Sequence, residues 1–324
     1  MKLSVLATKG HRLLSLVAAV DVFATANRFL EIEGEKPFFE IQIIGQSDHS
    51  VLAESFRDYP FFDISNPNLK SDVIIVPAFA NREMQENIGN NIRFIPFLHE
   101  NYQNGASLVS LCTGSFLLAA SGLLNGKSAT THLEASDKFE AAFPEVNLQP
   151  HAIITENENI YTSGGATSSF HLKLHLIQKF CGREIAVRVA KNFAIDLDRN
   201  NQLYFDQFKP DLVEDDDLVC MVQKLINEKY SEIKTVEEAL EVVPSSRRNI
   251  IRRFKQKTGI TPIRYLQKTK IEAAKNLLET TNKDILEVMV SCGYNDMKNF
   301  RQLFKSLTGL TPKGYRDKYG MRLS

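Results

Sequence analysis

The stretch Arg253-Phe254-Lys255-Gln256-Lys257-Thr258-Gly259-Ile260-Thr261-Pro262 decides the fold of the last third of this chain, because a copy of it follows further along. The copy is Leu303-Phe304-Lys305-Ser306-Leu307-Thr308-Gly309-Leu310-Thr311-Pro312, at an offset of 304 − 254 = 50 residues, and Tyr265 recurs as Tyr315 at the same offset. A fixed period indicates a repeated architecture. Two copies are too few for a solenoid, so the sequence predicts a tandem pair of one supersecondary unit.

Each copy has the pattern of a helix-turn-helix. In the second copy, Asp284–Val290 carries apolar residues at helical spacing, and Cys292-Gly293-Tyr294 then interrupts the pattern. Glycine tolerates the positive φ of a tight turn between two helices. Asp296 is placed to cap the next helix, over Met297–Leu307, and Ser246 is expected to cap the corresponding helix of the first copy.

The second helix of each predicted unit exposes donor side chains of the types that read guanine and adenine edges. We expect the DNA-contacting residues to be Arg247, Arg248, Asn249, Arg252, Lys298, Asn299, Arg301, Gln302 and Lys305. A solvated basic face on an ordinary helical bundle is the simpler interpretation of either helix alone, but not of the tandem pair.

The distribution of charge also favours nucleic acid as a partner. The whole chain is neutral, with 39 Lys+Arg and 39 Asp+Glu. Residues 218–324 hold 21 Lys+Arg and 11 Asp+Glu, a net of +10, which leaves 39 − 21 = 18 and 39 − 11 = 28, a net of −10, for the remainder. Neutralisation of phosphates by such a basic module supplies most of the non-specific affinity for DNA.

With this repeat and its Cys292-Gly293-Tyr294 turn, residues 218–320 resemble the AraC/XylS family of bacterial transcription activators. The resemblance implies two helix-turn-helix units in successive major grooves, joined by one long helix. Here that helix is expected from Pro262 to about Glu279, a length of roughly 27 Å at 1.5 Å per residue. One departure is Glu241-Val242-Val243-Pro244, which stands where the family usually has a glycine-containing turn.

The first 195 residues alternate strand-like and helix-like segments. The alternation predicts an α/β N-terminal domain with a parallel sheet, a flavodoxin-like sandwich, followed by an all-α C-terminal domain with two helix-turn-helix motifs. A polar, acidic linker is expected over residues 196–217, between domains at 1–195 and 218–320. The predicted strands are Leu3–Ala7, Phe39–Ile44, Val73–Val76 and Ser107–Leu111, and the predicted helices include Leu13–Arg28 and Asn91–Gln103.

Several classes of protein are not indicated. No segment reaches about 18 consecutive apolar residues, and no cleavage site for a signal peptide follows the short basic start. The cysteines are dispersed, without a Cys-x-x-Cys pair or a histidine at zinc spacing. We therefore expect a cytoplasmic protein with no disulfide, metal, cofactor or membrane partner. These cysteines are Cys112, Cys181, Cys220 and Cys292.

Cys112 stands where a buried strand turns directly into a helix. In a nucleophile elbow of this kind, a tight turn holds the side chain and the helix N-terminus lowers the thiol pKa. With Asp21 upstream and His132 and Thr162-Ser163-Gly164-Gly165 downstream, residues 1–195 resemble the ThiJ/PfpI group of the class I glutamine amidotransferase-like superfamily. The resemblance implies a nucleophilic cysteine, an acidic residue at the place of Asp21 that touches it, and a Gly-Gly pair after the third strand whose amides bind an oxyanion.

Two departures count against catalysis. Pro77-Ala78-Phe79 replaces the Gly-Gly pair, and Thr113 stands where proteases of the group carry a histidine. Three roles for Cys112 stay open: a ligand-pocket residue, a small residue packed at a turn, and a nucleophile. A solvated helical carboxylate for Asp21 and a structural hydrogen bond for His132 are the simpler alternatives. The expected ligand-binding residues are Asp21, Cys112, Thr113 and His132, with no catalytic residue unless Cys112 and Asp21 act in an enzyme.

Two hypotheses for function follow. The first is a sequence-specific transcription regulator whose N-terminal domain senses a small, nitrogenous metabolite. Its expected partners are double-stranded promoter DNA, the effector, RNA polymerase, and a second copy of the chain bound through the N-terminal domain. The second is a cysteine-dependent hydrolase or hydratase, isonitrile-hydratase-like or amidase-like, fused to a DNA-binding module.

Overall fold

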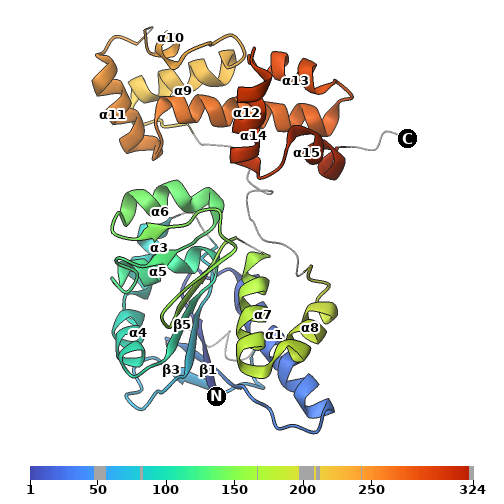
Figure 1. Ribbon diagram of the computed structural model, residues 1–324. Coiled ribbons are helices and arrows are strands. Elements are labelled where there is room, and N and C mark those ends of the chain that lie inside the picture. The colour runs from blue at the N-terminus through green and yellow to red at the C-terminus, as the bar shows by residue number, and fades with distance from the viewer. Residues whose placement is uncertain are drawn as a thin grey trace. The chain divides into compact units, whose positions relative to one another are not determined.

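The computed structural model describes residues 1–46, 56–80, 83–165, 167–196, 208, 212–241 and 243–320. The chain divides into two compact units, Met1–Gln202 and Leu203–Ser324 (Figure 1). Most of the predicted linker, residues 197–207 and 209–211, lies outside the described residues, and so does Val242 in the first predicted helix-turn-helix.

A seven-stranded sheet forms the centre of the N-terminal unit, in the order β3-β2-β1-β4-β5-β9-β8. Neighbouring strands are parallel except β8, which runs antiparallel to β9. The four strands predicted from sequence match β1, β2, β4 and β5 to within one residue at each end. The strands are β1 (Lys2–Ala7), β2 (Glu40–Gly45), β3 (Phe61–Asp63), β4 (Val73–Val76), β5 (Ser107–Ser110), β8 (Ile154–Asn157) and β9 (Ile160–Ser163), with a separate pair β6 (Ser128–Ala129) and β7 (Asn147–Leu148).

Helices cover both faces of the sheet, as Figure 1 shows. Because side chains alternate along each strand, Val5 enters the core under α1, α7 and α8, whereas Leu6 enters the core on the opposite face. This arrangement confirms the predicted α/β class. The helices are α1 (Leu13–Ile32), α7 (Ser168–Cys181) and α8 (Arg183–Asn192) on one face and α3 (Met84–Asn91), α4 (Phe94–Gln103), α5 (Ser115–Ala120) and α6 (Ser136–Ala142) on the other.

The predicted start of the helix over Asn91–Gln103 was wrong. Asn91 ends α3, and α4 begins at Phe94. The Asn91 side chain accepts a hydrogen bond from the backbone N–H of Lys9 and donates to the Lys9 carbonyl, which fixes it to the loop after β1. Periodicity does not reveal this long-range attachment.

Helix α1 is long and apolar enough to cross a membrane by length and composition alone. Half of the apolar window is buried in the fold, where Leu16, Val20 and Phe23 belong to the core. A core helix of a globular domain explains its composition.

The described residues of the C-terminal unit form helices and the turns that connect them, with no strand among them. The unit has two hydrophobic cores, one formed by α9–α11 with the start of α12 and one by the remainder of α12 with α13–α15. The two predicted helix-turn-helix units therefore fold around separate cores at the two ends of α12 (Figure 1). The helices are α9 (Asp217–Lys229), α10 (Val236–Glu241), α11 (Arg247–Thr258), α12 (Pro262–Thr280), α13 (Ile285–Ser291), α14 (Met297–Thr308) and α15 (Pro312–Tyr319).

Local side-chain caps set the boundaries of these helices. Ser246 and Asp296 accept hydrogen bonds from backbone amides at the starts of α11 and α14, as predicted. Asp284 and Glu287 form a reciprocal capping box at the start of α13. Gly293 has φ +73°, which confirms the turn predicted between α13 and α14. Helix α12 ends at Thr280, one residue beyond the predicted end.

Candidate DNA interface and effector site

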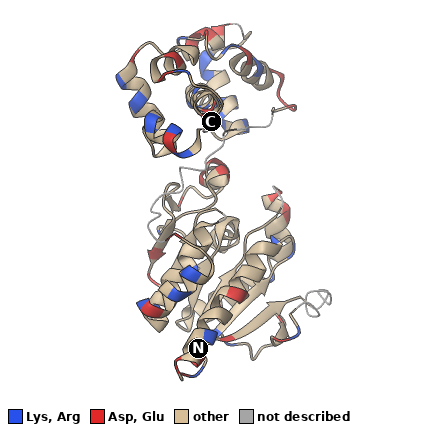
Figure 2. Ribbon diagram, turned by 90° about the vertical axis from the view of Figure 1, so that its right-hand side faces the viewer, with Lys and Arg blue, Asp and Glu red and all other residues tan. Residues whose placement is uncertain are grey.

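Helix α14 presents the more accessible of the two candidate reading surfaces. All five of its predicted DNA-contacting side chains are exposed, and within the described parts of the chain none of them forms a hydrogen bond or an ion pair. Their donors are thus free to meet a nucleic acid. Lys and Arg, blue in Figure 2, recur through the helices of this unit. The five residues are Lys298, Asn299, Arg301, Gln302 and Lys305.

Helix α11 differs, because part of its polar face is engaged within the protein. Arg247 pairs with Glu237 of α10. The Asn249 side chain donates to Ser245 Oγ at 2.9 Å and accepts from Arg252 at 3.0 Å. These groups would have to exchange partners in order to contact bases.

A buried carboxylate fixes α11 in place. Asp216 accepts a hydrogen bond from the Val219 N–H at the start of α9, and both of its oxygens lie 2.9 Å from nitrogens of the Arg253 guanidinium. Such a two-point pair sets direction as well as distance. Arg253 therefore positions the helix, although its place on the polar face suggested exposure. Sequence reasoning missed Asp216, whose only signal was its N-cap position.

The Cys112 turn has the backbone of a strained elbow. Cys112 has φ +54°, an uncommon conformation for a residue with a side chain, and is 5% exposed. Its N–H donates to Ser163 Oγ at 3.3 Å, and its carbonyl accepts from Ser115 and Thr131 hydroxyls. Gly114 is required beside it, because a Cβ there would lie 2.6 Å from the Val76 and Pro77 carbonyl oxygens.

The helix after this turn is short. Cys112–Gly114 forms one 3-10 turn, and α5 then runs for only six residues. Because the Cys112 amide is also engaged by Ser163, the expected helix N-terminus gives little support for an anion site here.

In the loop after β4, the described amides that could bind an oxyanion are already engaged within the protein. The Phe79 N–H donates to Thr113 Oγ1 at 2.9 Å, and the Ala78 N–H donates to Ser15 Oγ at 3.0 Å. Phe79 is 3% exposed, and its ring belongs to the core on that face of the sheet. Thr113, predicted as a ligand contact, instead holds this loop.

His132 lies beside the same turn in a fixed orientation. Its Nδ1 accepts the Glu134 N–H at 3.2 Å, and its ring packs on Gly165, where a Cβ would lie 2.7 Å from the ring. Burial lowers the pKa of His132, Glu134 raises it, and the charge of Arg12 lowers it further. A neutral ring with its proton on Nε2 satisfies this hydrogen bond. Arg12 is thus a charged neighbour that sequence reasoning did not identify.

Asp21 is not brought to this group. It is exposed on α1. The pKa of Tyr59 is raised mainly by burial of its phenol and, to a smaller extent, by the charge of Asp21. Ser15, which contacts the loop after β4, lies six residues earlier, a distance of about 9 Å along a helix and on a different face. The α1 residue at the turn is therefore Ser15, and the expectation for Asp21 is corrected.

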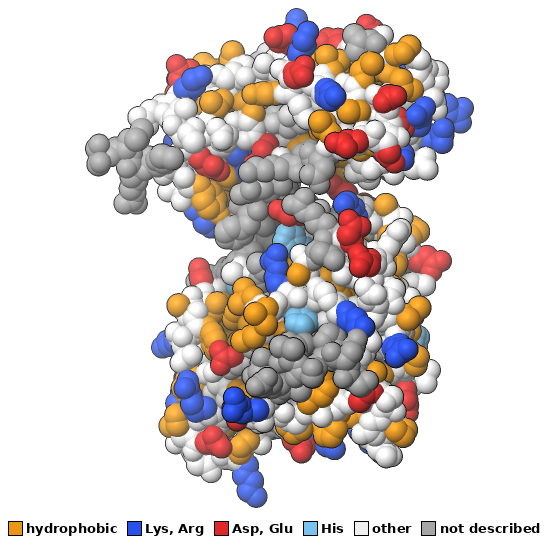
Figure 3. Space-filling model, turned by 180° about the vertical axis from the view of Figure 1, so that it is seen from behind, with side chains coloured by type: hydrophobic (Ala, Val, Ile, Leu, Met, Phe, Trp, Pro, Cys, Tyr) orange, Lys and Arg blue, Asp and Glu red, His pale blue; other side chains and the backbone are white. Residues whose placement is uncertain are grey.

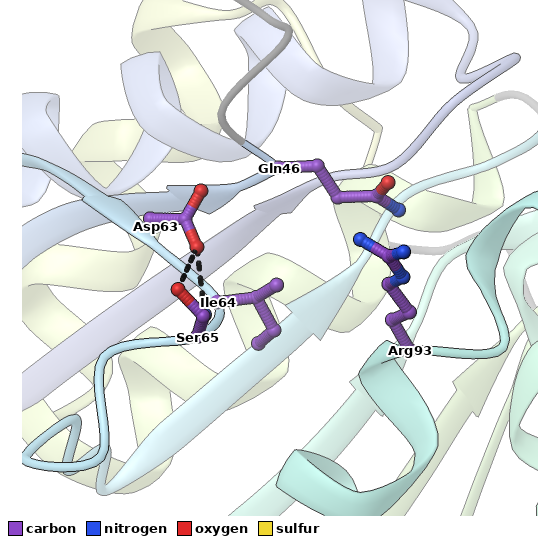
Figure 4. Close-up of a pocket in the computed structure, with 5 residues that line it drawn as sticks. All are labelled: Gln46, Asp63, Ile64, Ser65 and Arg93. Carbon is purple, nitrogen blue, oxygen red and sulfur yellow. Dashed lines mark hydrogen bonds between the residues drawn. The ribbon is translucent and has the colours of Figure 1, made fainter.

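A polar cavity of about 360 Å³ opens further along the same edge of the sheet, at the ends of β2 and β3. In Figure 4 the end groups of Gln46 and Arg93 extend toward each other across it, and Asp63 holds Ser65 through two hydrogen bonds. Arg93 gives this cavity one exposed positive charge. Among the described residues, no group of three His, Cys, Asp or Glu converges as a metal site would require.

The start of α1 exposes apolar side chains. Leu13 and Leu14 are each 63% exposed, and Val17 follows one turn later. Figure 3 shows exposed hydrophobic side chains, in orange, on the surface of the molecule. Apolar residues grouped in this way are common where a protein contacts a partner.

Comparison with known proteins shows that each unit matches a known protein family. The DJ-1/PfpI family matches residues 1–179, and a helix-turn-helix domain family matches residues 241–318. The HTH-type transcriptional regulator GbdR of Pseudomonas aeruginosa is 29% identical over 231 residues, which are 69% of this chain and 61% of GbdR. The chain thus spans about three fifths of the length of that relative.

Two further similarities extend over different shares of the chain. The HTH-type transcriptional regulator CdhR of Pseudomonas aeruginosa is 25% identical over 308 residues, 94% of this chain and 88% of CdhR. Among solved structures, Drosophila melanogaster DJ-1beta is 17% identical and matches with a TM-score of 0.44, covering 60% of this chain and 98% of that one.

Proposed function

The chain belongs to the DJ-1/PfpI family and carries an AraC-family helix-turn-helix region, and we propose that it is a sequence-specific DNA-binding transcription regulator. In this proposal residues 1–195 form a sensor domain, 196–217 a linker and 218–320 the DNA-binding domain. The observation that carries it is the exposed row of five donors on α14, which have no partner in the described parts of the protein. Donors of these types match the edges of guanine and adenine in the major groove.

DNA binding by the full chain tests this proposal. A binding site is selected from random duplexes, and affinity for the selected and for scrambled duplexes is measured as salt is raised. We expect preferential binding to the selected site and a steep fall in affinity for both duplexes with salt. A folded chain with no affinity for any duplex at low salt would contradict the proposal.

The N-terminal unit is proposed to bind a small nitrogenous metabolite near Cys112 and His132 without turning it over. Support comes from the Ala78 and Phe79 amides, which are bonded to Ser15 and Thr113 and so are withdrawn from oxyanion binding. A thermal-shift screen of nitrogenous metabolites tests for a ligand, because a compound that binds only the folded state raises its apparent stability. The same thermal-shift measurement on an Arg93→Ala variant distinguishes two binding sites for the ligand. A ligand of the cavity at β2 and β3 should lose its thermal shift, whereas a ligand of the Cys112 turn should keep it.

The strained Cys112 backbone keeps one alternative, a cysteine-dependent hydrolase or hydratase, in contention. Titration of thiol reactivity with pH separates the two functions. A catalytic thiolate titrates well below the ordinary cysteine pKa of about 8.5, whereas a sensor residue does not require this.

The remaining partners follow from the same proposal. The exposed Leu13, Leu14 and Val17 support a homodimer through the N-terminal domain. Sedimentation of the wild type and of a Leu14→Glu variant tests it, since a charge at a self-complementary interface should favour monomers. A transcription regulator of this kind would act in the cytoplasm and contact RNA polymerase.

A further inference from the structure

Lys270 occupies the junction between the two halves of the DNA-binding unit. Helix α12 contributes Tyr265 and Leu266 to the first core and begins its contribution to the second core at Ile271. Lys270 lies between these two groups and is only 4% exposed. An ammonium buried at this point needs partners, because burial of an unpaired charge is unfavourable.

The partners of Lys270 come from both halves. Its Nζ donates to the Ile233 carbonyl at 2.8 Å, in the loop between α9 and α10. It also donates to the Gly293 carbonyl at 3.0 Å, in the turn between α13 and α14. The same ammonium lies 5.0 Å from the centre of the Tyr294 ring. One side chain thus ties the loop before the first helix-turn-helix to the turn inside the second.

A backbone contact reinforces this connection. At Gly293 a Cβ would lie 2.2 Å from the Ser231 carbonyl oxygen and 2.8 Å from its carbonyl carbon. The turn of the second helix-turn-helix therefore touches the backbone of the first half, at a place where only glycine fits. This contact does not involve Lys270, but it joins the same two segments, the loop between α9 and α10 and the turn between α13 and α14.

We propose that Lys270 is a positioning residue that locks the two helix-turn-helix units into one rigid reader, so that the spacing between the two DNA half-sites becomes part of the recognised sequence. The proposal rests on DNA binding by this unit. Without Lys270, the separate cores would be joined by α12 and by the contact between Gly293 and Ser231, and small changes in the middle of α12 would be amplified at α11 and α14. When two modules are linked rigidly at the correct span, the second binds at a high effective concentration, and flexibility lowers this value.

The experiment measures spacing selectivity in the full chain. A two-part site selected by the wild type is altered by inserting or deleting one or two base pairs between its halves, and affinity is measured by fluorescence anisotropy. For the wild type we expect a loss of about 100-fold across this series, because half-site spacing is fixed by the protein. For Lys270→Met we expect a loss of about tenfold on the parent site and a spread of only about threefold across the series.

Three controls distinguish positioning from loss of folding or of charge. Lys275→Met removes the same charge from another buried lysine of α12, whose ammonium bonds Glu272 in the same helix, and should keep the wild-type spacing preference. Lys270→Arg should restore that preference, because a guanidinium can reach both carbonyls. A duplex with only the α14 half-site should bind Lys270→Met and the wild type equally if the second unit is folded.

The outcomes separate this inference from the proposed function. A wild type without any sequence preference contradicts DNA recognition itself. A wild type that selects a site but tolerates every spacing, or a Lys270→Met variant that keeps the full spacing preference, overturns the lock. Equal loss with Lys270→Met and Lys275→Met also overturns it, since the effect would then be one of charge.

Discussion

Replacement of Lys173 by methionine should stabilise the N-terminal unit. Lys173 lies in the middle of α7, is completely buried, and its Nζ has no hydrogen-bond partner among the described residues. Its nearest electrostatic support is the Phe170 ring, whose centre is 4.2 Å from the ammonium nitrogen. Burial lowers the pKa of Lys173 from 10.5 to about 7. Methionine fills a similar volume without a charge.

The pKa of Lys173 fixes both the size and the sign of the effect. The difference between 10.5 and about 7 corresponds to about 5 kcal/mol at 1.36 kcal/mol per pH unit. Relaxation around the amine reduces such penalties, so we expect a gain of about 2–4 kcal/mol in the free energy of unfolding at pH 7. Between pH 7 and 10.5 the unfolded chain binds the extra proton, so wild-type stability should rise with pH in this window. The variant should lose that rise.

Pulse proteolysis in urea measures this free energy for one unit at a time, if cleavage is followed through peptides from residues 1–195. The matched control is Lys179→Met on the same helix, whose exposed ammonium donates to Glu156 and Tyr161. That change should lower stability by no more than about 1 kcal/mol. A Lys173→Met variant that is less stable than the wild type at every pH would refute the reasoning and imply a polar partner for the amine.

Three further changes test the candidate sites and one helix cap. Asn299→Ala should reduce affinity for the selected duplex by about 1–3 kcal/mol and relax preference at one base pair, read by sequencing selected duplexes; an equal loss on all sequences would make Asn299 a phosphate contact. Cys112→Ser should preserve a ligand-induced thermal shift and the transcriptional response to that ligand. Loss of that response with intact DNA binding would instead indicate covalent chemistry at Cys112. Asp284→Ala should cost about 1 kcal/mol of stability in urea by removing the α13 cap, whereas Asp284→Asn should retain most of it.

The helical repeat was predictable because its hydrogen bonds are local. Thr258 Oγ1 donates to the Phe254 carbonyl and accepts the Ile260 N–H, and Thr308 makes the equivalent bonds 50 residues later. Gly259, between Thr258 and Ile260, takes the left-handed conformation that ends helix α11. Every partner lies within four residues, so the sequence pattern contains the whole interaction. Such a pattern can be read without knowledge of the tertiary fold.

The proposed effector site was less predictable because its contacts join distant segments. The Ser15 hydroxyl accepts the Ala78 N–H across 63 residues, and the Ser163 hydroxyl accepts the Cys112 N–H across 51. Nothing in the local pattern around Ser15 distinguished it from other helical serines. Asp21 was predicted to contact Cys112 because it is a carboxylate, but helical geometry places it on a different face of α1 from Ser15. The type of residue was a weaker guide than its position relative to the sheet edge.

The two copies of the repeat have diverged in how they use positive charge. In the first copy Arg253 pairs with the buried Asp216 and Arg247 pairs with Glu237 at the surface, and their counterparts in the second copy are Leu303 and Met297. A count of basic residues therefore overstates the donors that α11 offers to DNA and understates the role of α14. Because side chains such as Asn299 need no rearrangement before they meet a base, they do not carry the cost of breaking an internal bond first. Sequence preference should accordingly be stronger in the half-site beneath α14 than in the half-site beneath α11.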